Sequence, residues 1–173
     1  MQFETKRLIL REMVDEDFSA LYEILSDPFT MQHYPAPFDE EKVRLWIERN
    51  RTRYSADGFG LWAVILKETG ALIGDCGITM QNINSQLLPE IGYHIHKDHQ
   101  RKGYASEGAA ECMRFAFEEC NLPAVYSYMK YTNAASYGVA LKNGMRLVEE
   151  YADPINTLTK VYAITCEEWN IRR

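Results

Sequence analysis

The sequence predicts an α/β (α+β) fold: one mixed, mostly antiparallel sheet of six to seven strands with about four helices, in a single domain covering residues 1–173. Three observations lead to this prediction. The chain has 173 residues, of which 46% are hydrophobic, and this suits one core but leaves too little length for two ordinary domains. Short β-rich runs are separated by segments whose apolar residues recur every three or four positions. The sequence also contains no internal repeat and no low-complexity segment.

The first half of the chain is expected to form a strand, two helices and a hairpin. Residues 3–13 alternate in part between apolar and polar side chains, which predicts a strand with one covered face. Asp15 starts the first helix, and Asp27 ends it because the residue before a proline avoids the helical region. Asp39 caps the second helix after a loop rich in aromatic residues and prolines. Residues 60–80 contain two β-rich runs around a short glycine-bearing turn, which predicts a hairpin.

The second half is expected to alternate strands and helices. A strand at 90–96 leads through a polar loop into residues 103–120, whose small and apolar side chains follow the steps of an amphipathic helix. Asn133 and Gly144 match the residue preferences of the start and the end of a shorter helix. The remaining predicted elements are that helix at 133–143 and strands at 125–131, 145–151 and 158–166.

The charge balance and the lack of certain segments exclude several classes of function. The chain carries 19 Lys and Arg against 25 Asp and Glu, a net charge of −6, so nothing indicates nucleic acid binding and a cationic substrate is mildly favoured. The longest aliphatic or aromatic run, Leu61 to Leu66, is far shorter than the roughly 20 residues of a membrane helix. No secretory signal is evident, so we expect a cytoplasmic protein with reduced core thiols at Cys76, Cys112, Cys120 and Cys166.

The most informative motif is the polar loop that leads into the long helix. A helix N-terminus exposes about four unpaired amide groups and carries roughly half a positive charge, so such a loop can hold a pyrophosphate. Gly103 lets the backbone come close, and the two basic residues before it attract phosphate. An ordinary basic surface loop could have the same residues. The position of this loop between a strand and a helix favours the phosphate site. The motif consists of Gln100, Arg101, Lys102, Gly103, Tyr104 and Ala105.

A second motif follows downstream, and together the two resemble those of a known family. Thr132 to Ser136 precede Leu141 to Met145, and Glu90 to Tyr93 (Glu-Ile-Gly-Tyr) precede the loop. Their order and separation resemble the GNAT superfamily of acyl-CoA N-acyltransferases. Within it the chain is most similar to the ribosomal-protein-alanine N-acetyltransferases, whose opening and closing segments are matched by Thr5 to Arg11 and Val161 to Trp169. The resemblance covers nearly the whole chain.

This resemblance implies a GNAT-like domain that binds acetyl-CoA, with a sheet splayed at the strand of Glu90. The extended pantetheine arm would join the open strand edge through main-chain hydrogen bonds, and the pyrophosphate would lie in the loop. Asn133 would contact the arm while it caps its helix. The implied cofactor-binding residues are Tyr93, His94 and Ile95 through their main chain, Gln100, Arg101, Lys102, Gly103, Tyr104, Ala105 and Ser106 in and after the loop, and Asn133 with Ser136.

The implied reaction transfers an acetyl group from acetyl-CoA to a primary amine by direct attack through a tetrahedral intermediate. A backbone N–H of the splayed strand would face the thioester oxygen, where negative charge develops. The acceptor is expected to be a protein or peptide N-terminal α-amine or a small amine, because an α-amine of pKa about 7.7 to 8 loses its proton more easily than a lysine at about 10.4. We expect a monomer or homodimer with no nucleic acid or membrane partner of its own.

Glu90 is the preferred general base, because a carboxylate at the start of the binding strand can draw a proton from a bound ammonium. The alternative is a strand-end glutamate that only pairs with a nearby Lys or Arg. His94 and His96 share its face by strand alternation and are further candidates for a base or relay. A metal site that adds His99 is disfavoured, because no fourth ligand is evident.

Ser136 is the candidate donor of a proton to the departing thiolate, as in the subgroup, although a polar residue at this position can simply complete a helix cap. Two positions depart from the family pattern. Ala140 stands where many relatives have a tyrosine, and Tyr128 stands where others have a glutamate. These departures keep open a catalytically weak acyl-CoA-binding sensor or interaction module. A dinucleotide-binding enzyme is disfavoured, because the chain lacks a G-x-G-x-x-G turn.

The acceptor pocket is expected between the first two helices and the sheet. Aromatic residues gather in that part of the sequence, and loops at helix ends commonly carry specificity. The alternative for such residues is ordinary core packing. The candidates for binding the acceptor are Phe29, Tyr34 and Trp46, with Met31, His33 and Phe38 in the same cluster.

Overall fold

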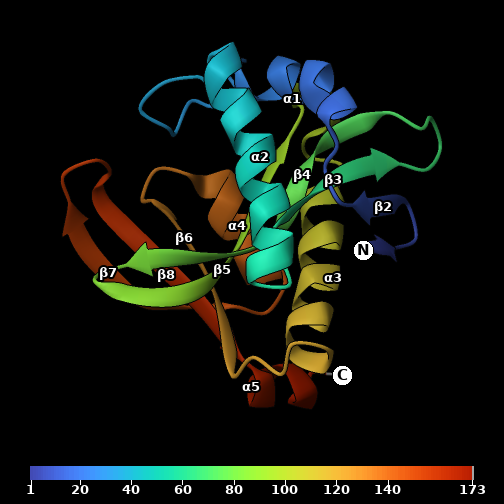
Figure 1. Cartoon of the computed structure of the whole chain (residues 1–173). Helices are drawn as coiled ribbons and strands as arrows, with labels where there is room; N and C mark the ends of the chain where they lie inside the picture. Colours follow the sequence, from blue (N-terminus) through green and yellow to red (C-terminus); the bar gives the residue numbers. More distant parts are fainter. Residues whose placement is uncertain (173) are drawn as a thin grey trace.

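The computed structural model describes residues 1–172, which form one eight-stranded sheet flanked by five α-helices (Figure 1). The strands are β1 (Gln2–Glu4), β2 (Leu8–Arg11), β3 (Leu61–Leu66), β4 (Leu72–Ile83), β5 (Gln86–Ile95), β6 (Ala124–Lys130), β7 (Arg146–Asp153) and β8 (Thr157–Thr165). The helices are α1 (Phe18–Leu25), α2 (Glu40–Ala56), α3 (Tyr104–Glu118), α4 (Ala134–Lys142) and α5 (Cys166–Ile171). Two 3-10 turns, η1 (Asp15–Asp17) and η2 (Lys97–His99), complete the described elements.

The sheet has the strand order β1-β2-β3-β4-β5-β6-β8-β7, and all neighbouring strands except β5 and β6 run antiparallel. β4 and β5 pair along ten positions, whereas the described residues of the parallel strands β5 and β6 have one register pair, Glu90 with Tyr126. Beyond that contact the two strands diverge (Figure 1). The predicted splay at the strand of Glu90 is therefore confirmed.

Helices cover both faces of the sheet because the side chains of its central strands alternate between two cores. On β3, Trp62 packs into the core that contains α3, and Ala63 packs into the core that contains α1 and α2. The core beside α3 is the larger and includes the fully buried Trp62, whose ring meets Phe115 edge to face. This arrangement leaves α2 and the loop before it above the face of β4 and β5 where the candidate site lies (Figure 1).

The helix boundaries that the sequence predicts are confirmed by their caps. Asp39 Oδ1 accepts a hydrogen bond from the N–H of Lys42 at the start of α2. Asn133 Oδ1 accepts one from the N–H of Ser136 at the start of α4. Gly144 follows the end of α4 with φ +86°, the left-handed conformation that favours glycine.

The predicted fold class, an α/β fold with a mixed and mostly antiparallel sheet, is confirmed. The described residues form eight strands and five α-helices, where six to seven strands and about four helices were predicted. The single strand predicted at 3–13 is a hairpin of β1 and β2, closed by the N–H of Thr5 on the carbonyl of Leu8. α5 lies where only a strand end was predicted, although Thr165 and Glu168 form a capping box that the sequence pattern T-x-x-E indicates. β5 begins four residues before the predicted strand, because Asn84 and Ser85 make a tight turn with positive φ at both positions.

The described chain contains no helix with both the length and the apolar character needed to cross a membrane. Its four cysteines are free thiols. Cys76 and Cys112 are buried, with their Sγ atoms 3.7 Å apart, while Cys120 and Cys166 are half-buried. The predicted core position is therefore confirmed for the first pair only.

Candidate active site

The divergence of β5 from β6 leaves main-chain groups of β5 facing an open seam. The carbonyl of Ile91 accepts a hydrogen bond from Ser127 Oγ of β6 at 3.2 Å, and the carbonyl of Ile95 accepts one from Gln100 Nε2 at 2.9 Å. Both therefore point away from β4, and the two-residue period of a strand gives the main chain of Tyr93 the same direction. β6 forms no further register pair there within the described residues. The main chain of Tyr93 can accordingly bind an extended ligand.

The main chain of His94 does not face the seam, although the sequence predicts that it pairs with the pantetheine arm. Its N–H donates to Asp75 Oδ1 at 3.1 Å, so this group faces β4 rather than the seam. The reason is the same two-residue period, which allows only alternate residues of β5 to face a ligand strand. The open main-chain position at the seam is thus Tyr93, and the carbonyl of Ile95 is already held by Gln100.

The loop before α3 places a glycine and several basic side chains at the N-terminus of that helix. Gly103 is the N-cap of α3 with φ +84°, and Arg101 also has a positive φ of 60°. A Cβ placed on Gly103 would stand 3.3 Å from Arg7 Nη2 and 3.7 Å from Lys142 Nζ, so two further cations flank the glycine. Amide groups of a helix N-terminus beside several cations are suited to a diphosphate.

The side chains of the loop divide into exposed and buried ones. Arg101 and Lys102 are exposed and available to a ligand. Tyr104 and Ser106 are buried, and the Tyr104 ring packs under the Arg7 guanidinium with 4.5 Å between Cζ and the ring centroid. Tyr104 therefore supports the loop from the core side.

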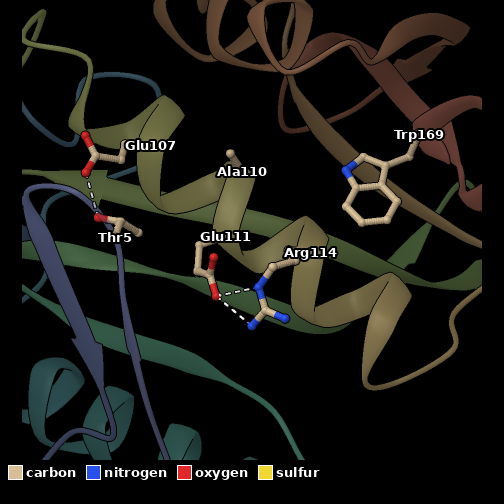
Figure 2. A pocket seen from close by; sticks show the side chains of 6 residues that line it. All are labelled: Thr5, Glu107, Ala110, Glu111, Arg114 and Trp169. Atoms are coloured by element: carbon tan, nitrogen blue, oxygen red, sulfur yellow. Dashed lines mark hydrogen bonds and ion pairs between the residues drawn. The ribbon is translucent and has the colours of Figure 1, made fainter. Parts of the chain in front are cut away.

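Arg7 and Glu107 hold this loop in place, and the sequence reasoning did not identify either of them as part of the site. Arg7 Nη1 donates to the carbonyl of Lys102 at 2.9 Å, and Arg7 Nε donates to Glu107 Oε2 at 2.6 Å. Glu107 also accepts from Thr5 Oγ1 at 2.6 Å, so the β1–β2 turn is tied to α3 (Figure 2). These contacts lower the pKa of Glu107 despite the opposing effect of its partial burial. No local pattern indicates contacts between residues about 100 positions apart.

The hollow of about 320 Å³ on the outer side of α3 is separate from the seam. It is lined by Thr5, Glu107, Ala110, Glu111, Arg114 and Trp169 (Figure 2). Glu107 is engaged as described above, and Arg114 Nη2 pairs with Glu111 Oε1 at 2.7 Å. Its charged groups thus bind one another, and this hollow is not the candidate active site.

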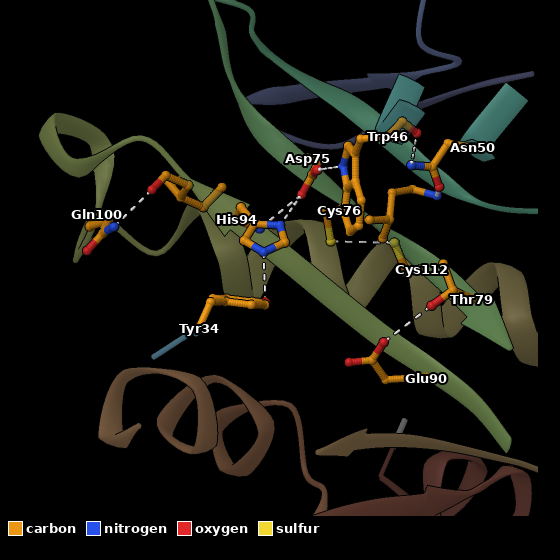
Figure 3. Close-up of polar contacts among 12 residues, drawn as sticks. Tyr34, Trp46, Asn50, Asp75, Cys76, Thr79, Glu90, His94, Gln100 and Cys112 are labelled. Atoms are coloured by element: carbon orange, nitrogen blue, oxygen red, sulfur yellow. Dashed lines mark hydrogen bonds and ion pairs between the residues drawn. The ribbon is translucent and has the colours of Figure 1, made fainter. Parts of the chain in front are cut away.

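Glu90 lies at the point where the seam begins. It is half-buried, and burial raises the pKa of its carboxyl from the ordinary 4.5 to about 7, although a hydrogen bond from Thr79 Oγ1 at 3.3 Å opposes this (Figure 3). A Cβ on Gly92 would stand 3.2 Å from Glu90 Oε2, so the missing side chain there leaves room for the carboxylate. A carboxyl that titrates near neutrality is suited to act as a general base.

A row of hydrogen bonds joins four side chains on the same face of the sheet (Figure 3). Trp46 Nε1 donates to Asp75 Oδ2 at 2.8 Å, and His94 Nδ1 lies 2.8 Å from Asp75 Oδ1. His94 Nε2 lies 2.7 Å from the hydroxyl of Tyr34. Burial by itself lowers the pKa of His94, but the neighbouring carboxylates of Asp75 and Glu90 outweigh it and the net shift is upward. Asp75 was missed by the sequence reasoning, although an aspartate inside an apolar strand was the available signal.

Ser136 lies beside the seam through its contacts with Tyr93. The hydroxyl of Tyr93 donates to the carbonyl of Ser136 at 2.8 Å and lies 3.2 Å from Ser136 Oγ. The N–H of Ser136 is used by Asn133, so the cap and the proximity to the seam coexist. Burial raises the pKa of Tyr93 above its ordinary value.

The aromatic residues predicted to form the acceptor pocket do not all lie in one place in the structure. Tyr34 and Trp46 meet at His94, whereas Phe29 is 56% exposed and takes part in none of these contacts. Phe38 meets the ring of Trp46 edge to face, and with Met31 it lies in the core between α1 and α2, against which Trp46 also packs. Tyr128 lies on β6, and burial together with the charge of Glu90 raises the pKa of its hydroxyl to about 12. Ala140 is buried in the core behind α4.

The remaining histidines lie outside this row. His96 Nε2 pairs with Glu23 Oε1 at 3.3 Å on the exposed side of α1, and its ring contacts that of His99. Among residues 1–172, no group of three or more His, Cys, Asp and Glu side chains is arranged to hold a metal ion.

Comparison with known proteins agrees with this geometry. Residues 7–146 match the model of the Acetyltransferase (GNAT) domain family. The uncharacterized N-acetyltransferase YnaD of Bacillus subtilis is 33% identical over 98% of this chain and 100% of its own length. The structure of a GNAT-family acetyltransferase from Bacillus anthracis superposes with a TM-score of 0.84 at 27% identity, over 96% of this chain and 99% of that one.

A third similarity concerns the fold alone. RimL, a ribosomal L7/L12 alpha-N-protein acetyltransferase solved in complex with coenzyme A, superposes with a TM-score of 0.80 at 16% identity, over 95% of this chain and 98% of that one. The family model spans most of the chain, and the curated relative covers nearly all of it. The chain therefore belongs to the GNAT family of acetyltransferases and is an acyltransferase enzyme.

Proposed function

We propose that this protein transfers the acetyl group of acetyl-CoA to a primary amine, and that its acceptor is the α-amine of a protein or peptide. The observation that carries the proposal is the seam between β5 and β6, which opens beside Glu90 and runs toward the N-terminus of α3. A thioester ligand with an amide-bearing arm and a diphosphate fits these features. RimL was solved in complex with coenzyme A, which supports the choice of ligand. RimL is also an alpha-N-protein acetyltransferase, which supports the choice of acceptor.

The residues present are suited to hold acetyl-CoA. The main chain of Tyr93 would pair with the pantetheine arm, and the amide groups at Gly103 would bind the diphosphate. Arg7 and Lys142 lie close enough to Gly103 to add charge there. Asn133 keeps its side-chain N–H₂ group for the arm, since its Oδ1 is used by the helix cap. The loop residues named from the sequence remain candidates for the same contacts.

Glu90 is proposed to act as the general base, and Ser136 as the donor of a proton to the leaving thiolate. Glu90 titrates near pH 7, so it can take a proton from a bound ammonium. Ser136 Oγ and the Tyr93 hydroxyl lie 3.2 Å apart beside the seam. A coenzyme A thiol of pKa about 8.5 requires only modest help in leaving, so Ser136 suffices although Ala140 replaces the tyrosine of many relatives.

A peptide with a free α-amine and no lysine is expected to be acetylated at least tenfold faster, in kcat/KM at pH 7.5, than the same peptide with a blocked N-terminus and one lysine. The larger share of neutral amine favours the α-amine, because its pKa is about 2.5 units below that of lysine. Release of free thiol from acetyl-CoA measures both rates, with a doubly blocked peptide as the control. A preference for lysine contradicts the proposed acceptor. Binding of acetyl-CoA with no thiol release on any amine would instead favour the acyl-CoA sensor.

A further inference from the structure

Tyr34, His94 and Asp75 form a row of polar side chains that runs from the surface into the sheet (Figure 3). Tyr34 lies in the loop between α1 and α2, His94 is on β5 and Asp75 is on β4. The Tyr34 residue is 44% exposed, whereas His94 is 8% exposed and Asp75 is fully buried. The outer residue of the row is therefore partly exposed at the surface, and the inner end is closed to water.

The hydrogen bonds fix the direction in which a proton can move. Asp75 accepts at Oδ2 from Trp46 and at Oδ1 from the N–H of His94, as expected of an ionised carboxylate. His94 Nδ1, 2.8 Å from the same carboxylate, therefore carries a hydrogen. In neutral His94 the other nitrogen, Nε2, is then an acceptor and takes the hydroxyl proton of Tyr34. The free lone pairs of the Tyr34 oxygen remain for a donor outside the row.

The proposed reaction needs such an acceptor. An alkylammonium that becomes an amide loses two protons from its nitrogen, and the thiolate takes up one. Glu90, with one carboxyl group, can hold only the first of the two protons. The nitrogen of the attacking amine becomes acidic once it bonds to the carbonyl carbon, so its second proton requires a separate base.

We propose that Tyr34, His94 and Asp75 form a proton relay that accepts the second proton of the acceptor amine. The proposal rests on the proposed acetyl transfer and adds three residues to it. As the new C–N bond forms, the amine N–H proton passes to the Tyr34 oxygen while the Tyr34 proton passes to His94 Nε2. The C–S bond then breaks, and the thiolate takes the proton of Ser136, which is restored from water. The imidazolium of His94, held beside Asp75, and the carboxyl of Glu90 return their protons to water.

Tyr34 would touch the acceptor, whereas His94 and Asp75 act through it as positioning residues. Other titratable groups act electrostatically on the row from the strands β5 and β6. Glu90 on β5, Tyr93 on β5 and Tyr128 on β6 act on Tyr34, and Glu90 also acts on His94. From α2 the row is met by the indole of Trp46. Because Glu90 acts on both residues, the rate of each relay variant is compared with the wild-type rate at the same pH, where Glu90 is present in both enzymes.

The test compares Tyr34→Phe, His94→Gln and their combination with the control Tyr22→Phe. Tyr22 is a tyrosine of α1 whose ring stacks on Phe18 away from this row. At pH 7.5 each relay variant is expected to lower kcat about 100-fold, at the low end for general base catalysis, with the KM for acetyl-CoA unchanged. The deficit shrinks as the pH rises, because hydroxide then takes the second proton. The double variant loses no more than either single one, and Tyr22→Phe keeps the wild-type rate.

The outcomes separate this proposal from the proposed function. Thiol release by the wild-type enzyme with an amine establishes acetyl transfer, and no release on any amine removes that function. Given turnover, a kcat for Tyr34→Phe within twofold of the wild type overturns the relay. A deficit that stays constant with pH, or that appears in the KM for acetyl-CoA, also overturns it, because a purely structural role lowers the rate equally at every pH.

Discussion

Gly103→Val is expected to raise the Kd for acetyl-CoA about 100-fold, since the loss of one to two charge-assisted hydrogen bonds costs about 1.5 to 3 kcal/mol each. The reason is geometric. A Cβ at this position enters the space bounded by Arg7 Nη2 and Lys142 Nζ, where the diphosphate is proposed to lie. The φ of +84° is also unfavourable for a β-branched residue, so the amide groups at the start of α3 lose their orientation. Calorimetric titration with acetyl-CoA measures the change.

Gly58→Val is the matched control for backbone strain. Gly58 follows α2 with a similar φ of +79°, and a Cβ there meets no atom within 4 Å. Both variants should lower Tm through the same conformational cost, whereas only Gly103→Val should lose affinity. An unchanged Kd in Gly103→Val would rule out the loop as the diphosphate site. Equal losses of affinity in the two variants would point to general destabilisation.

Glu90→Gln is expected to lower kcat about 100- to 1,000-fold at pH 8, with the Kd for acetyl-CoA unchanged, because an amide cannot take the ammonium proton. In the wild-type enzyme, kcat should rise as the pH increases through about 7, where the carboxyl of Glu90 loses its proton. This rise should be missing in Glu90→Gln. Rates measured from pH 5.5 to 9 by thiol release test both statements, and equal rates for the two enzymes across this range would remove Glu90 from the mechanism.

Thr79→Val tests whether Glu90 controls the pH dependence of kcat, and it leaves the carboxyl in place. Thr79 Oγ1 donates to Glu90 Oε2 and thereby lowers its pKa. Valine has nearly the same shape and no hydroxyl, so the pKa of Glu90 should rise and the midpoint of the rate profile should move to higher pH. The kcat at high pH should stay near that of the wild type. A midpoint that does not move indicates that another group controls the profile.

The same pKa shift has a consequence for stability. The folded state holds the Glu90 proton more tightly than the unfolded chain does, because its pKa is raised from 4.5 to about 7. Ionisation of Glu90 therefore opposes folding increasingly as the pH rises from about 4.5 to about 7, and the full cost remains above that range. Glu90→Gln should accordingly raise Tm at pH 8 and leave it nearly unchanged at pH 4.5.

Local residue patterns determined most of the elements and the location of the loop that we propose as the cofactor site. Asp39 and Asn133 mark helix starts through short-range hydrogen bonds to residues three positions away, so a single sequence reveals them. The position of Gly103 at a helix start can be predicted for a similar reason, because the residue types around it are typical of the start of a helix. The division of the first predicted strand into β1 and β2 was missed because no glycine, proline or asparagine marks the turn at residues 5–7.

The chemistry of the site depended on contacts that only the tertiary structure decides. The pKa of Glu90 follows from its burial, and sequence position does not show burial. Asp75 and His94 meet because β4 and β5 pair in one particular register, and a shift by one residue would send their side chains to opposite faces. Arg7 reaches α3 across about 100 residues of chain. Local hydrogen bonds and apolar periodicity involve residues that are near neighbours in the chain, so they can be predicted from the sequence. Burial, charge coupling and strand register arise only when distant segments pack together.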